Sequence, residues 1–167
     1  SVVPFGGINP IMSTNPFAFS MPGSEINPVS SDFAISTIAA GKIAVAKANN
    51  TPLPDGAIID SDGHASRNPD DFYAGGALLP AAGPKGSGMG IIAELVGNAM
   101  LGSALEFNWL IICMRVDAFQ PISQYKVAVS KLSKQVRKSS PATGHQKVLM
   151  PGDLEEKKYQ DCVNSGY

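Results

Sequence analysis

The sequence predicts a mixed α/β fold, built as one domain or as one domain with an appendage. Short segments of strand character and turn-rich loops alternate with helical patterns along its 167 residues. With 44% apolar and 16% charged residues, the chain has the composition of a protein that can bury a core. Neither an internal repeat nor a low-complexity tract interrupts this order of elements.

Two short strands are expected near the N-terminal end. In the segment 15–21, Phe17, Phe19 and Met21 alternate with smaller residues, as they do in a strand with one apolar face. A loop rich in Pro and Gly follows, and a second short strand is expected at 29–33.

Two helical patterns lie in the middle of the chain. The Ala- and Ile-rich segment 36–48 predicts a helix, and the segment 51–76 that follows is rich in turn residues. In 88–101, apolar side chains cover nearly the whole circumference, and only Glu94 and Asn98, four residues apart, interrupt them. This pattern predicts a buried helix with one polar strip.

The C-terminal part predicts four further elements. The apolar segment 108–116 has the length and composition of a buried strand. From 122 to 136 the apolar positions recur every three or four residues, which indicates an amphipathic helix. A short strand is expected at 147–150, and a short charged helix at 153–162.

Charge and composition exclude several classes of function. Lys and Arg total 13 against 14 Asp and Glu, so nothing favours nucleic acid as a partner. The longest apolar run, 109–114, is far shorter than the roughly 20 residues that cross a bilayer, so no membrane partner is expected. Cys113 and Cys162 form no disulfide framework, which favours a reducing, cytoplasmic location. Because the chain opens at Ser1, we expect it to be a piece of something longer.

The stretch LLPAAGPKGSGMGIIAELVG, at 78–97, combines glycines with one lysine before an apolar segment. It is not a P-loop, because Lys85 precedes its glycine, and GSGMG does not have the spacing of a dinucleotide fingerprint. A glycine turn before a helix still offers free amides and a positive helix end to an anion, and Lys85 adds a charge there. The alternative is a tight turn that packs a helix, and spacing alone favours this alternative.

Other candidate motifs have structural interpretations. The segment DSDGH, 60–64, lacks the ligand pattern of an EF-hand and predicts a turn. His64 and His145 have no neighbour at zinc-ligand spacing, so no metal is expected. The basic residues of the 121–138 helix could suggest an acidic partner, but a solvated helix face is favoured; they are Lys126, Lys131, Lys134, Arg137 and Lys138. Asp32 could cap the following turn or accept a hydrogen bond from a ligand hydroxyl.

Six blocks, taken together and in this order, resemble the malate/L-lactate/ureidoglycolate dehydrogenase family, which does not share the Rossmann fold. The resemblance covers almost the whole chain, and the longest block is quite specific. The blocks are VVPFGG (2–7), TNPFAF (14–19), SDFAIS (31–36), GK (41–42), LLPAAGPKGSGMG (78–90) and VLMPGD (148–153).

The resemblance implies an α/β domain that binds NAD or NADP, a 2-oxo or 2-hydroxy acid such as malate or lactate as substrate, and a homodimer. It implies a cofactor-binding domain at 1–140 and a C-terminal return segment at 141–167. Ser130 is a weaker candidate for the site. The cofactor-binding residues that it implies are Asp32, Phe33 and Ala34 along the cofactor, Lys85 on a phosphate, and Gly152, Asp153 and Leu154 on the opposite side.

The chain also departs from the family pattern. The family's catalytic histidine and its carboxylate-binding residue precede the first block, so no catalytic residue is assigned here and no turnover is expected from this chain alone. Ser13 replaces a glycine, and the connection 102–108 is shorter than in the family. Two alternatives stay open: a truncated, non-catalytic nucleotide-binding or dimerisation module, and a small anion-binding protein that uses only the Lys85 turn.

Overall fold

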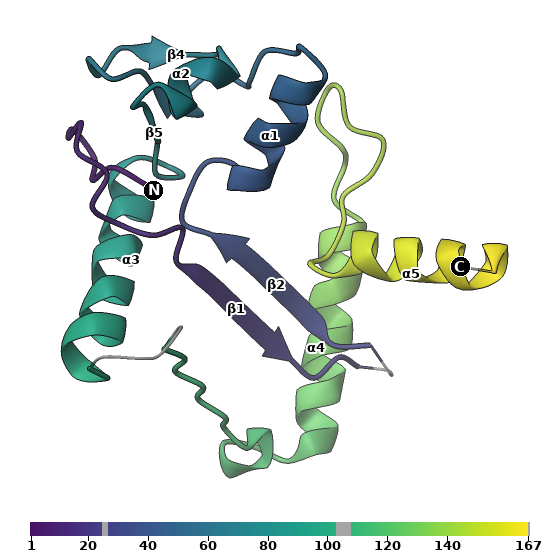
Figure 1. Ribbon diagram of the computed structural model, residues 1–167. Helices are drawn as coiled ribbons and strands as arrows, with labels where there is room; N and C mark the ends of the chain where they lie inside the picture. Colours follow the sequence, from purple (N-terminus) through teal and green to yellow (C-terminus); the bar gives the residue numbers. More distant parts are fainter. Residues whose placement is uncertain (25–26, 103–107, 167) are drawn as a thin grey trace. The chain divides into compact units, whose positions relative to one another are not determined.

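The computed structural model describes residues 1–24, 27–102 and 108–166, so the shortened connection falls mostly outside the described residues. Helices and short strands alternate along the chain, which confirms the mixed α/β class (Figure 1). The chain forms two compact units. The first comprises Ser1–Phe17 and Phe33–Ile111, and the second comprises Ala18–Asp32 and Ile112–Tyr167. The boundary expected at residue 140 concerns cofactor binding and stays a prediction.

The first two strands form where the alternating pattern places them. β1 spans Pro16–Met21 and β2 spans Val29–Ala34, and they pair as a two-stranded sheet (Figure 1). The chain passes from the first unit to the second within β1 and returns within β2.

A small antiparallel sheet supports the first unit. Its order is β4-β3-β5, with β3 at Ile58–Ile59, β4 at Ala65–Ser66 and β5 at Ala77–Leu78. The short helix α2, Pro69–Tyr73, follows β4, so the segment expected to be rich in turns contains brief regular elements between its turns.

The core of the first unit is aliphatic and gathers segments from far apart in the sequence. Val2 pairs with Met12 and with Leu78, which fixes the N-terminal segment onto the end of the small sheet. The fully buried members of the cluster are Val2, Met12, Ile35, Ile43, Leu53, Ala57, Ile58 and Leu78.

Helix α1 spans Ala40–Ala48 and begins four residues later than predicted. The backbone before it is engaged elsewhere, because Thr37 donates its amide to the carbonyl of Leu79 at 2.9 Å and Ser36 forms a bridge with Pro80. These bonds keep 36–37 extended, so the helix cannot start there.

The helix predicted at 88–101 exists but is not buried on almost every side. It begins at Pro84, runs as α3 to Glu94 and continues as the π-helix η1, Leu95–Met100. Ile91, Ile92 and Leu95 are 44%, 57% and 54% exposed, whereas its buried face consists of Gly86, Ser87 and Gly90. The small residues, not the large apolar ones, face the core.

Two predicted strands do not form. The segment 108–115 has no regular structure and η2, Val116–Ala118, is a 3₁₀ turn, so the prediction of a buried strand at 108–116 is wrong. The segment 147–150 is a loop, and the amide of Met150 bonds to the side chain of Asp153 instead of to a sheet.

Both predicted C-terminal helices form in the second unit. α4 spans Ile122–Arg137 and α5 spans Asp153–Ser165. Tyr125 is buried on α4 and donates its hydroxyl to the carbonyl of Pro22 at 2.7 Å. None of the helices in the described ranges combines the length and apolar content needed to cross a bilayer.

Candidate functional site

The glycine stretch ends in a sharp turn that starts α3. Ala82 and Gly83 both have positive φ, +53° and +58°, and Pro84 occupies the first helical position, where its missing amide is not needed. The amides of the following residues are occupied: Lys85 donates to Ala82, Gly86 to Ala81 and Ser87 to Gly83. The expectation of free amides for an anion therefore does not hold for these residues.

Lys85 lies in the first turn of α3. Its side chain is exposed at the N-terminal end of an 11-residue helix, whose dipole adds positive potential. Within the ranges that the structure describes, no ion pair joins Lys85 to an acidic side chain. The role of the Lys85 ammonium group on a cofactor phosphate stays a prediction.

The glycines behind Lys85 allow close packing. A β-carbon on Gly86 would collide with the carbonyl oxygen of Ala81, and one on Gly90 would lie 2.9 Å from the sulfur of Met12. Ser87 lies on the same face and accepts a hydrogen bond from the amide of Phe5 at 2.9 Å. The packing interpretation therefore holds for Gly86 and Gly90, and the ligand role of Lys85 stays a prediction.

The end of β2 lies beside the turn that carries Lys85. Ile35, which follows Ala34, accepts a hydrogen bond from the amide of Ala81 at 2.8 Å. Phe33 stacks on Phe17 with 6.2 Å between ring centroids. The first unit thus brings together two of the segments that the resemblance assigns to the cofactor.

Asp32 and the Gly152 turn lie in the second unit. Asp32 is exposed, and its carboxylate makes no capping hydrogen bond among the described residues. The cap interpretation is therefore not supported. Gly152 packs beside the backbone of Pro28 and Ser30 at the start of β2, two residues before Asp32. Leu154 is exposed, and Ser130 is half-buried on α4.

Asp153 is the most tightly bonded of the candidate residues. Its carboxylate accepts two hydrogen bonds from Arg137, at 2.7 and 3.2 Å, and one from the amide of Met150 at 2.9 Å. The bonds from Arg137 hold the pKa of Asp153 below its ordinary value; burial opposes this effect, and the bond from the Met150 amide adds to it.

Arg137 was missed by the sequence analysis, which placed the basic residues of this helix on a solvated face. It is 16 residues from Asp153 and separated from it by a loop, so no helical spacing connects the two. The pair can be recognised only in the folded structure, where the connection 138–152 brings Asp153 back to the end of α4.

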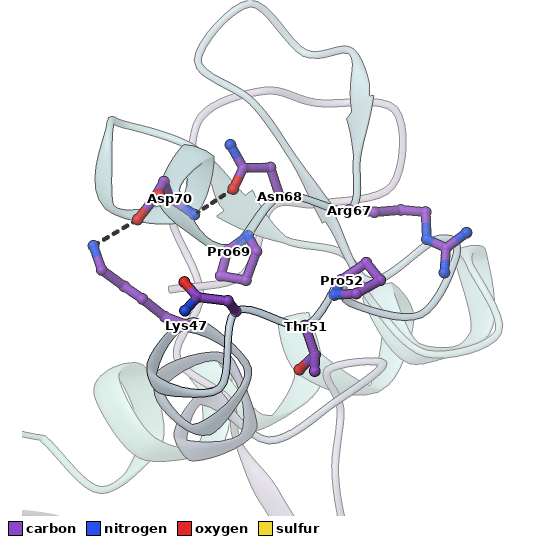
Figure 2. A pocket seen from close by; sticks show the side chains of 8 residues that line it. Lys47, Thr51, Pro52, Arg67, Asn68, Pro69 and Asp70 are labelled. Carbon is purple, nitrogen blue, oxygen red and sulfur yellow. Dashed lines mark hydrogen bonds and ion pairs between the residues drawn. The ribbon is translucent and has the colours of Figure 1, made fainter.

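An open pocket of about 530 Å³ lies elsewhere in the first unit, between the end of α1 and the start of α2 (Figure 2). Its two basic groups are engaged: Lys47 pairs with Asp70 at 2.6 Å, and Arg67 donates to the carbonyl of Leu53 at 2.8 Å. Asn68 accepts a hydrogen bond from the amide of Asp70 and caps α2. None of the predicted site residues lines this pocket, and the bonds that engage its charged groups leave it without a ligand assignment.

The segment 60–64 forms the turn that its sequence predicts. Asp60 accepts the amides of His64 and Asp62 at 2.9 and 3.0 Å, and these bonds, that from His64 above all, hold the pKa of Asp60 below its ordinary value against the effect of burial. The ligand atoms of the three side chains lie within 4.8 Å of one another. Because these groups are mostly exposed and the turn explains their geometry, they carry no metal assignment.

Fold and site together define a mixed α/β protein whose glycine turn is not of the Rossmann type. The turn follows β5, which pairs antiparallel with β3, whereas a Rossmann fingerprint follows a strand of a parallel sheet. The chain belongs to the malate/L-lactate dehydrogenase family, whose model matches residues 1–167. The family resemblance and the expected fold are therefore confirmed.

Individual relatives agree with this membership. The chain is 31% identical over 170 residues to L-sulfolactate dehydrogenase of Methanocaldococcus jannaschii, covering 94% of this chain and 48% of that protein. The solved structure of that enzyme superimposes with a TM-score of 0.81 at 28% identity, over 96% of this chain and 50% of the other.

Two further relatives show the range of the family. Ureidoglycolate dehydrogenase (NAD(+)) of Escherichia coli O157:H7 is 28% identical over 180 residues, which cover 99% of this chain and 51% of the relative. Delta(1)-pyrroline-2-carboxylate/Delta(1)-piperideine-2-carboxylate reductase of Pseudomonas putida is 39% identical over 110 residues, 65% of this chain and 32% of the relative.

The relatives include dehydrogenases whose names specify NAD and others whose names specify NADP, so homologues of this chain are NAD(P)-dependent. The chain spans about half the length of the curated relatives that it matches from end to end.

Proposed function

We propose that this chain is the cofactor-binding part of an NAD(P)-dependent oxidoreductase that transfers a hydride between the nicotinamide and a 2-hydroxy or 2-oxo acid. The family match over residues 1–167 carries the proposal. The contact between the end of β2 and the Lys85 turn supports it, because the two segments that the family resemblance assigns to the cofactor adjoin. The proposal also includes malate or lactate as the substrate, a homodimer and a cytoplasmic location.

The residues present fit a dinucleotide. Lys85 offers an exposed cation at a helix start to a phosphate, and the exposed carboxylate of Asp32 can accept a hydrogen bond from a ribose hydroxyl. Phe33 and Ala34 would line the cofactor, and Gly152, Asp153 and Leu154 would close over it. When bound, the nicotinamide would supply the hydride chemistry. His64 and His145 lie outside the matching motifs, so neither is assigned as the acid or base.

The proposal is tested by calorimetry with NADH and NADPH on the folded chain. We expect one of them to bind, and Lys85→Ala to weaken binding by about ten- to a hundredfold, because a charged hydrogen bond to phosphate is lost. Lys131→Ala on α4, also an exposed helical lysine, is the control and should leave the affinity unchanged. A folded wild-type chain that binds neither nucleotide would refute the proposal.

We also expect this chain alone to show no dehydrogenase turnover, because its matching motifs do not contain the histidine that the family resemblance implies as the acid and base. The measurement is NADH absorbance with oxaloacetate or pyruvate. Steady oxidation of NADH that depends on the substrate would contradict this expectation.

A non-catalytic nucleotide-binding or dimerisation module is the second candidate, and the observation that favours it is the half-length match to the relatives. The coding sequence upstream of Ser1 distinguishes the enzyme from the non-catalytic module. An in-frame helical region with a His-Gly pair supports the enzyme, and a start codon directly before Ser1 supports the module.

A further inference from the structure

The turn before α5 is closed by one carboxylate. Asp153 accepts the amide of Met150 and donates its own amide back to the carbonyl of Met150 at 3.1 Å. Gly152 lies inside this loop with φ +95°, a conformation that residues other than glycine rarely adopt, and its carbonyl accepts the amide of Glu156 as α5 begins. The Asp153 side chain therefore determines the shape of the turn.

Arg137 ties this turn to a fixed element. It is the last residue of α4, a helix held in the second unit through Tyr125 and Pro22. The connection 138–152 is largely exposed, so the chain itself gives the turn little support. The two bonds from Arg137 to Asp153 span this connection and link the end of one helix to the start of the next.

The pair is stronger than an ordinary surface ion pair. Two parallel bonds from a guanidinium to a carboxylate are favourable and geometrically specific, and the Asp153 side chain is only 24% exposed. With three bonds made, the carboxylate has most of its acceptor capacity filled and little left for a ligand.

We infer that Arg137 and Asp153 are a positioning pair that holds the Gly152–Leu154 turn beside β2 in the shape that receives the cofactor, and that Asp153 does not itself contact the cofactor. The inference rests on the proposed function. It assigns Arg137 a role in cofactor binding, and it changes the role that the family resemblance implies for Asp153.

A mutant cycle in the full chain tests the inference, with NADH affinity measured by nucleotide fluorescence. Arg137→Ala and Asp153→Ala should each weaken binding about tenfold, and the double variant should lose no more than either single variant. Arg137→Lys should restore part of the affinity. Arg115→Ala, which removes a similar two-bond pair with Asp117 in the same unit, is the control and should bind normally.

Amide hydrogen exchange at 152–154 provides a readout independent of the ligand, and far-UV circular dichroism checks that each variant is folded. Arg137→Ala should speed exchange at these amides, and Arg115→Ala should not. Unchanged exchange, or losses of affinity that add in the double variant, would overturn the inference. A wild-type chain that binds no nucleotide would refute the proposed function, and the exchange result would still decide whether the pair holds the turn.

Discussion

The three glycines Gly86, Gly88 and Gly90 occupy one helix at spacings of two, yet their surroundings differ. β-Carbons on Gly86 and Gly90 would meet backbone or core side chains, whereas one on Gly88 would meet open space. The pattern GSGMG cannot show this difference, because what each glycine approaches is decided by segments far away in the sequence. The packing role of Gly86 and Gly90 becomes visible only in the folded structure.

Alanine substitutions should therefore have opposite effects at two of these positions. Gly86→Ala should lower the free energy of unfolding by about 2 kcal/mol or more, because the helix must move away from Ala81. Gly88→Ala should raise it by about 0.5–1 kcal/mol, because alanine favours an exposed helix interior. Urea denaturation followed by circular dichroism measures both. Equal effects of the two substitutions would contradict this account.

The sequence was sufficient to place some site residues and not others. Lys85 was expected in the glycine turn before a helix, and it lies in the first turn of α3, which starts at Pro84 and not at the predicted Gly88. The partnership of Asp153 with Arg137 could not be predicted, because it depends on how the loop after α4 returns.

At the scale of elements, α3 shows that the periodicity of apolar residues does not by itself identify the buried face of a helix. The pattern located the helix but gave the wrong buried face. Small residues can bring a helix closer to its neighbours than large ones, and here they do. Glu94 accepts a hydrogen bond from Asn98, its expected partner on the polar strip, at 2.7 Å. It also accepts hydrogen bonds from the amide of Ser13 and the side chain of Asn15 at 2.7 and 2.9 Å, which the pattern did not predict.

The strand predicted at 108–116 failed for a related reason. Apolar, β-branched composition reports a preference for burial between partners, and a strand forms only when a neighbouring strand supplies hydrogen bonds. The amphipathic helix α4 could be predicted because its hydrogen bonds are internal.

The link between α4 and α5 should make stability depend on pH. The pKa of Asp153 is lowered in the folded chain, so the pair stabilises the fold above the ordinary pKa of aspartate, about 4. This stabilisation is lost as the pH falls through the lower, folded value. Urea denaturation between about pH 6 and about pH 3 should show a smaller loss of stability in Arg137→Ala than in wild type. Equal losses of stability in wild type and Arg137→Ala would show that the pair does not contribute to the pH dependence.

At the scale of the whole molecule, large apolar side chains remain uncovered. Trp109 and Ile111 are 77% and 78% exposed, and they lie in the same unit as the exposed apolar residues of α3. Exposed apolar side chains such as these are candidates for an interface with a partner. Composition predicted a core of ordinary size but could not predict which apolar residues it would leave out.

The single tryptophan makes the proposed self-association measurable. At low concentration Trp109 should emit as a water-exposed indole. If a homodimer forms through this surface, raising the protein concentration should shift the emission to shorter wavelength together with dimerisation in analytical ultracentrifugation. Dimerisation without any shift would place the interface elsewhere.

The open space around Gly88 has a practical consequence. Position 88 lies three residues after Lys85, so the two are neighbours on the helix surface. With the exposed thiols of Cys113 and Cys162 replaced by serine, Gly88→Cys would carry an environment-sensitive dye without disturbing the packed face of α3. Such a labelled chain would be an optical sensor for whatever anion Lys85 attracts, and it could be screened against metabolites before any substrate is known.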